Sequence, residues 1–214
     1  VTRNVLAEQL KTVWNHGVTY DCLNFESGIL YSNLWEKIFE RIKSENIARL
    51  ETEGDNAGCW VMPIEGEDEK ILVRSNGVAT YVAKDIPYAA WKLGILDDPF
   101  NYAKYTTQQN DRVLYETTLE KTKHPKQSFV ADKVITVIDN RQTRLQKIVS
   151  GLMSKFKSES SYIHLGYEAV TLSPETVKLL GFKTDGKDVQ MSGRKGIYVN
   201  ADEIIGKLEN RILI

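Results

Sequence analysis

Cationic and hydroxyl side chains gather in a glycine-hinged stretch near the carboxyl end of the chain, DVQMSGRKGIYVN. Ser192, Arg194 and Lys195 are interleaved there with Gly193 and Gly196. Glycines allow a loop to close over a ligand, and guanidinium and ammonium groups neutralise phosphate oxygens, so this composition suits a loop that binds a polyphosphate. The G-x-x-x-x-G-K-[ST] spacing of a P-loop is absent from the whole chain. Most basic glycine-containing turns are simply solvated, so the loop alone does not define a site.

A second candidate is the pair formed by Tyr81 and Asp85, which are four residues apart. On a helix this spacing puts both side chains on one face. A carboxylate beside an aromatic hydroxyl suits a cation, and a guanidinium above all, because a carboxylate accepts two of its N–H groups side by side. The competing interpretation is an exposed surface pair, or an aspartate that caps local backbone, and spacing alone favours that second interpretation.

Several elements must position these groups. The segment 81–93 is expected to form a helix that Gly94 ends, with Pro87 kinking the axis so that the first turn is offset from the rest. The β-branched run KVITVI, residues 133–138, predicts a strand buried on both faces, as in a parallel sheet, and a helix follows it. Ligands of such sheets bind beyond the carboxyl ends of the strands, where Asn140, Arg141 and Gln142 lie. Gln142 is therefore a third candidate, either for binding a cationic ligand or for fastening its own loop.

The rest of the chain fits an α/β protein. We expect an amino-terminal helix capped by Asn4 and ended by Gly17, a strand in 18–25, and a second helix that opens at Asn33. Two segments interrupt the alternation and are interpreted as insertions, a small β-containing one at 45–75 and a polar, poorly periodic, peripheral one at 97–130. A strand within 162–172, a short helix from Ser173 and a last helix capped by Asn200 complete the pattern.

The composition of the chain excludes several kinds of partner and site. The 214 residues carry a net charge of −1, which gives no sign of non-specific affinity for nucleic acid or membranes. Cys22 and Cys59 are too few for a disulfide framework, and the three histidines are scattered, so no metal site or Ser-His-Asp triad is readable from the sequence. His164 lies in an apolar strand and is expected to be a hydrogen-bonded core residue. We expect a soluble, cytoplasmic protein without a membrane segment, and the start at Val1 suggests a piece of a longer chain.

Taken in order, the motifs resemble the second part of the catalytic domain of class I arginyl-tRNA synthetases, of the archaeal type in particular. The stretches that carry the likeness are NFES (24–27), LVRSNGVATYVAKDIPYAAWKLG (72–94), VITVIDNRQ (134–142), YIHLGYEAVTL (162–172) and VQMSGRKG (189–196). The most specific is VRSNG…TYVAKDIPY, in which Asn76 stands where the family usually has aspartate. The resemblance implies the second half of a Rossmann-like nucleotide-binding domain with small β-containing insertions, spanning residues 1–214.

The resemblance also implies roles for single residues. Tyr81, Asp85 and Gln142 match positions that bind the substrate arginine, and Glu26 falls in a block close to the same substrate. The stretch QMSGR, within the loop region 188–200, stands in place of the Lys-Met-Ser-Lys-Ser loop that stabilises the phosphates of ATP. The implied catalytic residues of that loop are Ser192, Arg194 and Lys195, and the implied ATP-binding residues add Met191, Gly193 and His164. Arginine, tRNA(Arg) and ATP with its Mg²⁺ are the implied substrates and cofactor, without a metal site on the protein.

The chain departs from the family in two respects. Gln190 and Gly193 replace both lysines of the phosphate loop, and no two histidines have the spacing of the family's His-x-Gly-His block. The carboxyl-terminal anticodon-binding domain has no counterpart either, so we expect the 214 residues alone to lack aminoacylation activity. The leading hypothesis is a piece of an arginine–tRNA ligase. The alternatives are a non-catalytic paralogue that binds nucleotide or the acceptor end of tRNA, and a structural α/β domain.

Overall fold

A computed structural model describes residues 2–64, 67–80, 82–123, 128–158, 161–179, 189–190, 200–202 and 206. These residues divide into two compact units. One comprises residues 20–167, and the other comprises residues 1–19 with 168–214. The phosphate loop, Met191 to Lys195, and Tyr81 lie outside the described residues. Among the described helices, none has the length and apolar character needed to cross a bilayer.

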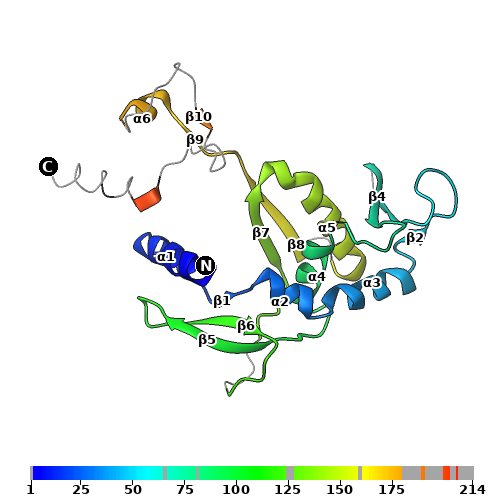
Figure 1. The fold of residues 1–214 in the computed structure, drawn as a ribbon, viewed down its shortest axis with the longest axis horizontal. Coiled ribbons are helices and arrows are strands. Elements are labelled where there is room, and N and C mark those ends of the chain that lie inside the picture. Colours follow the sequence, from blue (N-terminus) through cyan, green and yellow to red (C-terminus); the bar gives the residue numbers. More distant parts are fainter. Residues whose placement is uncertain are drawn as a thin grey trace. The chain divides into compact units, whose positions relative to one another are not determined.

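The larger unit is organised around helix α4 (Val82–Lys92), which packs against α2 (Glu26–Tyr31), α3 (Leu34–Ser44) and α5 (Thr143–Phe156) (Figure 1). Ile86, Ala90 and Trp91 on α4 are almost completely buried. The predicted helix stop is confirmed, because Gly94 has a φ of 65° and Ile95 N–H donates to the carbonyl of Ala90. Pro87 lies inside this helix as expected.

Two parallel strands lie next to the residues that the sequence analysis placed at a strand end. The strand β7 (Val134–Asp139) pairs in register with β8 (Tyr162–Tyr167), a turn η1 (Asn140–Gln142) follows β7, and α5 packs on β8. The predicted strand is present, but the prediction that both of its faces are buried is wrong. Ile135 is 56% exposed and Val137 63% exposed, whereas Val134 is buried. A continuous apolar run does not reveal which face the rest of the chain covers, and here only one face is covered.

The segment 45–75 contains a small antiparallel sheet, with strands β2 (Arg49–Leu50), β3 (Trp60–Ile64) and β4 (Glu67–Val73) in that order. Both expected strands of the hairpin are therefore present. Arg49 on β2 donates to both carboxylate oxygens of Glu69 on β4, which ties the two outer strands across β3. The side chains of Met62, Leu72 and Val73 are buried in the hydrophobic core, which attaches the sheet to it.

The segment 97–130 is less peripheral than its polar sequence suggests. It forms an antiparallel pair, β5 (Asn101–Thr107) and β6 (Val113–Thr118), and the short β1 (Cys22–Leu23) adds to β6 in parallel. Phe100, Tyr102 and Leu114 are at most 1% exposed, so the expectation of a surface insertion is wrong for these residues. The sequence hides the core role of Tyr102 because its polar hydroxyl is satisfied internally, by donation to Asp98 at 2.6 Å.

The smaller unit contains α1 (Thr2–Asn15), β9 (Thr171–Leu172), α6 (Pro174–Leu179) and β10 (Val189–Gln190), with β9 and β10 antiparallel. Two expectations for the first 25 residues are wrong. In the smaller unit, Asn4 lies inside α1 instead of capping it, and in the larger unit the strand expected in 18–25 is reduced to two residues. The helix α2, which follows that strand, was not expected. This helix brings Glu26 next to α4.

Candidate functional site

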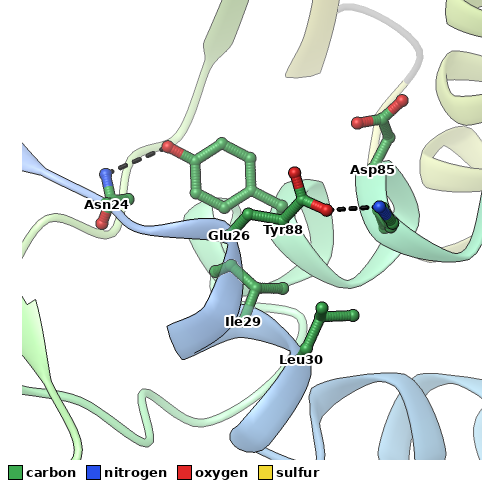
Figure 2. Close-up of a pocket in the computed structure, with 7 residues that line it drawn as sticks. Asn24, Glu26, Ile29, Leu30, Asp85 and Tyr88 are labelled. Carbon is green, nitrogen blue, oxygen red and sulfur yellow. Dashed lines mark hydrogen bonds and ion pairs between the residues drawn. The ribbon is translucent and has the colours of Figure 1, made fainter. Parts of the chain in front are cut away.

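A pocket of about 240 Å³ lies between α2 and α4. Its lining contains two carboxylates, one ammonium, one aromatic ring, one amide and two aliphatic side chains. They are Asn24, Glu26, Ile29, Leu30, Lys84, Asp85 and Tyr88 (Figure 2). Two candidates from the sequence, Glu26 and Asp85, therefore meet in one pocket although 59 positions separate them along the chain, 85 minus 26.

Helical spacing explains how each wall of the pocket forms. Glu26, Ile29 and Leu30 fall at i, i+3 and i+4 on α2, which gives one face of a helix. Asp85 and Tyr88 are likewise one turn apart on α4. The buried side of α4, with Ile86, Ala89 and Ala90, packs into the core and fixes the direction in which Asp85 and Tyr88 point. The two helices thus face each other across the pocket.

The two carboxylates have different electrostatic environments. Lys84 Nζ donates to Glu26 across the pocket in an ion pair that is exposed to solvent (Figure 2). Asp85 is half-buried and forms no hydrogen bond or ion pair within the described part of the chain. Burial, and to a lesser degree the neighbouring Glu26, raises the pKa of Asp85 above its ordinary 3.8, although Lys84 opposes the shift. A half-buried carboxylate in a pocket, with its pKa raised by burial, is a candidate for a residue that binds a cationic ligand.

The shape and chemistry of the lining restrict the ligand. Ile29 and Leu30 offer an apolar surface, Tyr88 offers a ring, and Asp85 and Glu26 offer negative charge. A ligand with an alkyl chain that ends in a planar cation matches all three properties. The apolar contacts take the chain, and the carboxylates accept hydrogen bonds from the cationic end.

Gln142 does not join this pocket. It is exposed and belongs to η1, the turn that follows β7, as the sequence indicated. At the same strand end Asp139 accepts from Arg141 Nε at 2.9 Å and from Arg141 N–H at 2.8 Å, and these bonds lower the pKa of Asp139. The structure therefore brings two of the four expected arginine-binding residues together, while Gln142 lies apart and Tyr81 is outside the described residues.

His164 lies on β8 next to this strand end. Its Nε2 is 3.0 Å from the carbonyl oxygen of Ile138, so the hydrogen bond expected from the sequence is present. The ring is half-buried and does not belong to the hydrophobic core, so the expectation of a core residue is wrong. Two residues further along β8, a Cβ on Gly166 would lie 1.8 Å from Asn140 Oδ1. The glycine therefore makes room for the side chain of Asn140. Among the described residues, no group of three histidine, cysteine, aspartate or glutamate side chains is placed to hold a metal ion.

The sequence reasoning missed five residues of the pocket, Asn24, Ile29, Leu30, Lys84 and Tyr88. Two signals were available. Tyr88 shares the helical face of Asp85 at i+3, and the i, i+3, i+4 pattern from Glu26 to Leu30 indicates a short helix. The strand expected through Phe25 obscured the second signal.

No family model matches the chain, but individual relatives do. An arginine–tRNA ligase of Deinococcus radiodurans is 30% identical over 215 residues, which cover 96% of this chain and 33% of the relative. An arginine–tRNA ligase of Thermococcus sibiricus is 28% identical over 99% of this chain and 32% of its own length. The chain thus spans about a third of the length of the curated relatives that it matches.

The fold leads to the same proteins. The solved structure of Thermus thermophilus arginyl-tRNA synthetase superposes with a TM-score of 0.77 and 28% identity, over 98% of this chain and 33% of that one. The chain is therefore homologous to one stretch of an aminoacyl-tRNA synthetase, with the mixed α/β fold of that class. Its relatives within the class are the arginyl-tRNA synthetases, and the resemblance inferred from the motifs is confirmed.

Proposed function

We propose that this chain is part of an arginine–tRNA ligase and that the pocket between α2 and α4 binds the substrate arginine. The observation that carries the proposal is the pair of carboxylates, Asp85 and Glu26, above an apolar wall. Asp85 accepts hydrogen bonds from the guanidinium, which supplies the counter-ion that this half-buried carboxylate lacks. Glu26 contributes a second negative charge to the pocket once the guanidinium replaces Lys84 as its partner.

The remaining arginine contacts belong to the same proposal. Tyr81 lies four positions before Asp85 in the sequence and matches a position of the family motif that binds the substrate arginine. Gln142 follows β7 at the carboxyl end of the strand, where an amide suits the polar groups of an amino acid. Both assignments rest on the family motifs.

For activation of the amino acid, we assign the loop residues Ser192, Arg194 and Lys195 to the phosphates of ATP. Met191, Gly193 and His164 complete the proposed nucleotide contacts. In the proposed reaction the arginine carboxylate attacks the α-phosphate of ATP, which forms arginyl-adenylate and releases pyrophosphate. The terminal ribose hydroxyl of tRNA(Arg) then takes the arginyl group and AMP leaves. The cationic side chains would neutralise charge on the phosphates as it develops, and Mg²⁺ bound with ATP would supply further neutralisation.

We further propose that residues 1–214 form a partial catalytic domain, with insertions at 45–75 and 97–130 and an ATP loop at 188–200, in a cytoplasmic enzyme. Since no two histidines have the His-x-Gly-His spacing, we expect the 214 residues to bind arginine without activating it. Arginine-dependent pyrophosphate exchange by these residues alone, at a rate typical of enzymes, would contradict this expectation.

One observation favours a second candidate, a non-catalytic paralogue that binds nucleotide or the acceptor end of tRNA. Gln190 and Gly193 stand where the phosphate loop of the family has lysines. Loss of both charges weakens contact with ATP, unless Arg194 and Lys195 take over the role. The mass of the native protein in its source cells, measured with an antibody against these residues, separates the two. A band well above 24 kDa supports the ligase, and a band at 24.4 kDa supports the paralogue.

Arginine binding tests the pocket directly. A titration of the ¹⁵N-labelled chain with L-arginine, followed by NMR, is suited to weak affinities. We expect shifts of the amides in α2 and α4 that disappear in Asp85→Asn but persist in Lys84→Gln, its neighbour on the same helix. Equal effects of the two substitutions would favour a purely structural role for Asp85.

A further inference from the structure

Two residues of the pocket, Tyr88 and Asn24, have no role in the function proposed above. Tyr88 lies one turn after Asp85 on α4, and Asn24 lies two residues before Glu26 (Figure 2). They are joined by a hydrogen bond in which Asn24 Nδ2 donates to the hydroxyl of Tyr88 at 3.0 Å. This bond links the two walls of the pocket next to the carboxylates.

Several neighbours fix the ring of Tyr88. Besides the bond from Asn24, the ring of Trp91 lies 5.7 Å away between centroids, and Lys92 Nζ lies 4.1 Å from the centroid of Tyr88. Trp91 is almost completely buried, so this contact is anchored in the core. Lys92 is not among the residues that line the pocket, whereas Tyr88 is. The ring is held in place before any ligand arrives.

The amide oxygen of Asn24 indicates that this residue has a functional role. Its Oδ1 is buried and has no hydrogen-bond partner among the described residues. A buried acceptor without a partner destabilises a fold, so stability does not explain an asparagine at this position. Placement of the Tyr88 hydroxyl does explain it, because an amide reaches that hydroxyl from the chain segment that leads into α2.

We propose that Tyr88 contacts the bound ligand as the aromatic wall of the pocket, and that Asn24 is the positioning residue that sets the angle of its ring. The inference rests on the proposed binding of arginine in this pocket and adds how the guanidinium plane is recognised. A guanidinium stacks on an aromatic face, which an ammonium does less well. Tyr88 therefore contributes selectivity for arginine over lysine, and Asp85 contributes the charge.

The NMR titration with L-arginine and L-lysine tests the role of the ring. Tyr88→Leu keeps an apolar side chain but removes the ring, and we expect it to weaken arginine binding about tenfold and lysine binding less. Tyr88→Phe keeps the ring and releases Asn24, so a loss of only about threefold is expected. Tyr31→Leu is the matched control, since Tyr31 lies on α2, is 77% exposed and does not line the pocket. It should bind like the wild type.

Asn24 is tested by loss and rescue. Asn24→Ala should weaken arginine binding about as much as Tyr88→Phe, and the two changes together should weaken it no further, because both break one bond. Asn24→Asp should restore affinity, since the hydroxyl of Tyr88 then donates to the carboxylate. A merely structural role would lower thermal stability in all Asn24 variants without this rescue.

The outcomes separate this inference from the function on which it rests. If wild type binds arginine, Asp85→Asn does not, and the Tyr88 and Asn24 variants bind like wild type, the inference is wrong and the pocket stands. If wild type shows no arginine-dependent shifts in α2 and α4, the pocket and the inference both fall. Dispersed amide spectra of each variant establish that a loss of binding is not a loss of fold.

Discussion

Asp85 and Asp139 have the same side chain, but the folded chain shifts their pKa values in opposite directions. Asp139, at the end of β7, accepts three hydrogen bonds from Arg141, two from the guanidinium and one from the backbone, and its pKa is lowered. Asp85, in the pocket, is half-buried and forms no hydrogen bond or ion pair with the described residues, and its pKa is raised. A carboxylate that the chain itself satisfies stabilises a turn. A carboxylate that the chain leaves unsatisfied is ready for a ligand.

The largest effect expected from this difference is on the affinity for L-arginine. Asp85→Asn should weaken binding of L-arginine by about thirtyfold or more, because a charged acceptor is lost from a partly desolvated pocket. Asp139→Asn should leave arginine affinity unchanged, since its partner is Arg141. Both affinities are measurable by NMR titration. Equal losses would mean that the two aspartates do not differ as the comparison states.

The two aspartates should also shift stability with pH in opposite directions. Because the pKa of Asp85 is raised in the folded chain, lowering the pH through that value protonates the folded chain first and stabilises it, until the unfolded carboxyl protonates near 3.8. The lowered pKa of Asp139 gives stability that is present above the unfolded value and lost as the pH falls through the folded one. Urea unfolding at several pH values, with Asp85→Asn and Asp139→Asn each compared with wild type, should give differences of opposite sign. Differences of the same sign would remove the contrast.

A smaller effect is expected for the second carboxylate of the pocket. Glu26→Gln should weaken arginine binding only about two- to fivefold, because Glu26 is exposed and already paired, and exposed ion pairs contribute little. Glu36→Gln, on the neighbouring helix α3 and outside the pocket, is the control. A loss as large as that of Asp85→Asn would mean that the exposed carboxylate carries the binding instead.

The smallest effect should have the opposite sign. Lys84→Gln removes the ammonium that pairs with Glu26, so arginine no longer displaces it, and affinity should stay equal or rise up to about twofold. The same titration measures this change. A clear loss of affinity would show that Lys84 assists the ligand and does not compete with it.

The sequence predicted parts of this site for physical reasons that can be stated. Asp85 could be identified from the sequence because helical spacing and a strong helix stop at Gly94 define the helical face on which it lies. Tyr88 lies on the same face at i+3 and could have been found in the same way, but its contact with Asn24 could not. That hydrogen bond joins positions 64 apart, 88 minus 24, and local patterns carry no information on such contacts. The strand β7 was predicted with the wrong burial, because an apolar run shows that one face is covered but not whether the other is. Tyr102 was taken for a surface residue because its partner, Asp98, is visible only in the folded chain.

Gly166 lets the side chain of Asn140 lie over β8. A Cβ at position 166 would lie 1.8 Å from Oδ1 of Asn140, so any other residue there requires the Asn140 side chain to turn away from the strand. Asn140 is exposed and its amide is the end of a flexible side chain, so it has room to do so. A substitution of Gly166 should therefore change where the Asn140 amide points, at the strand end that precedes Gln142, more than it changes the stability of the fold.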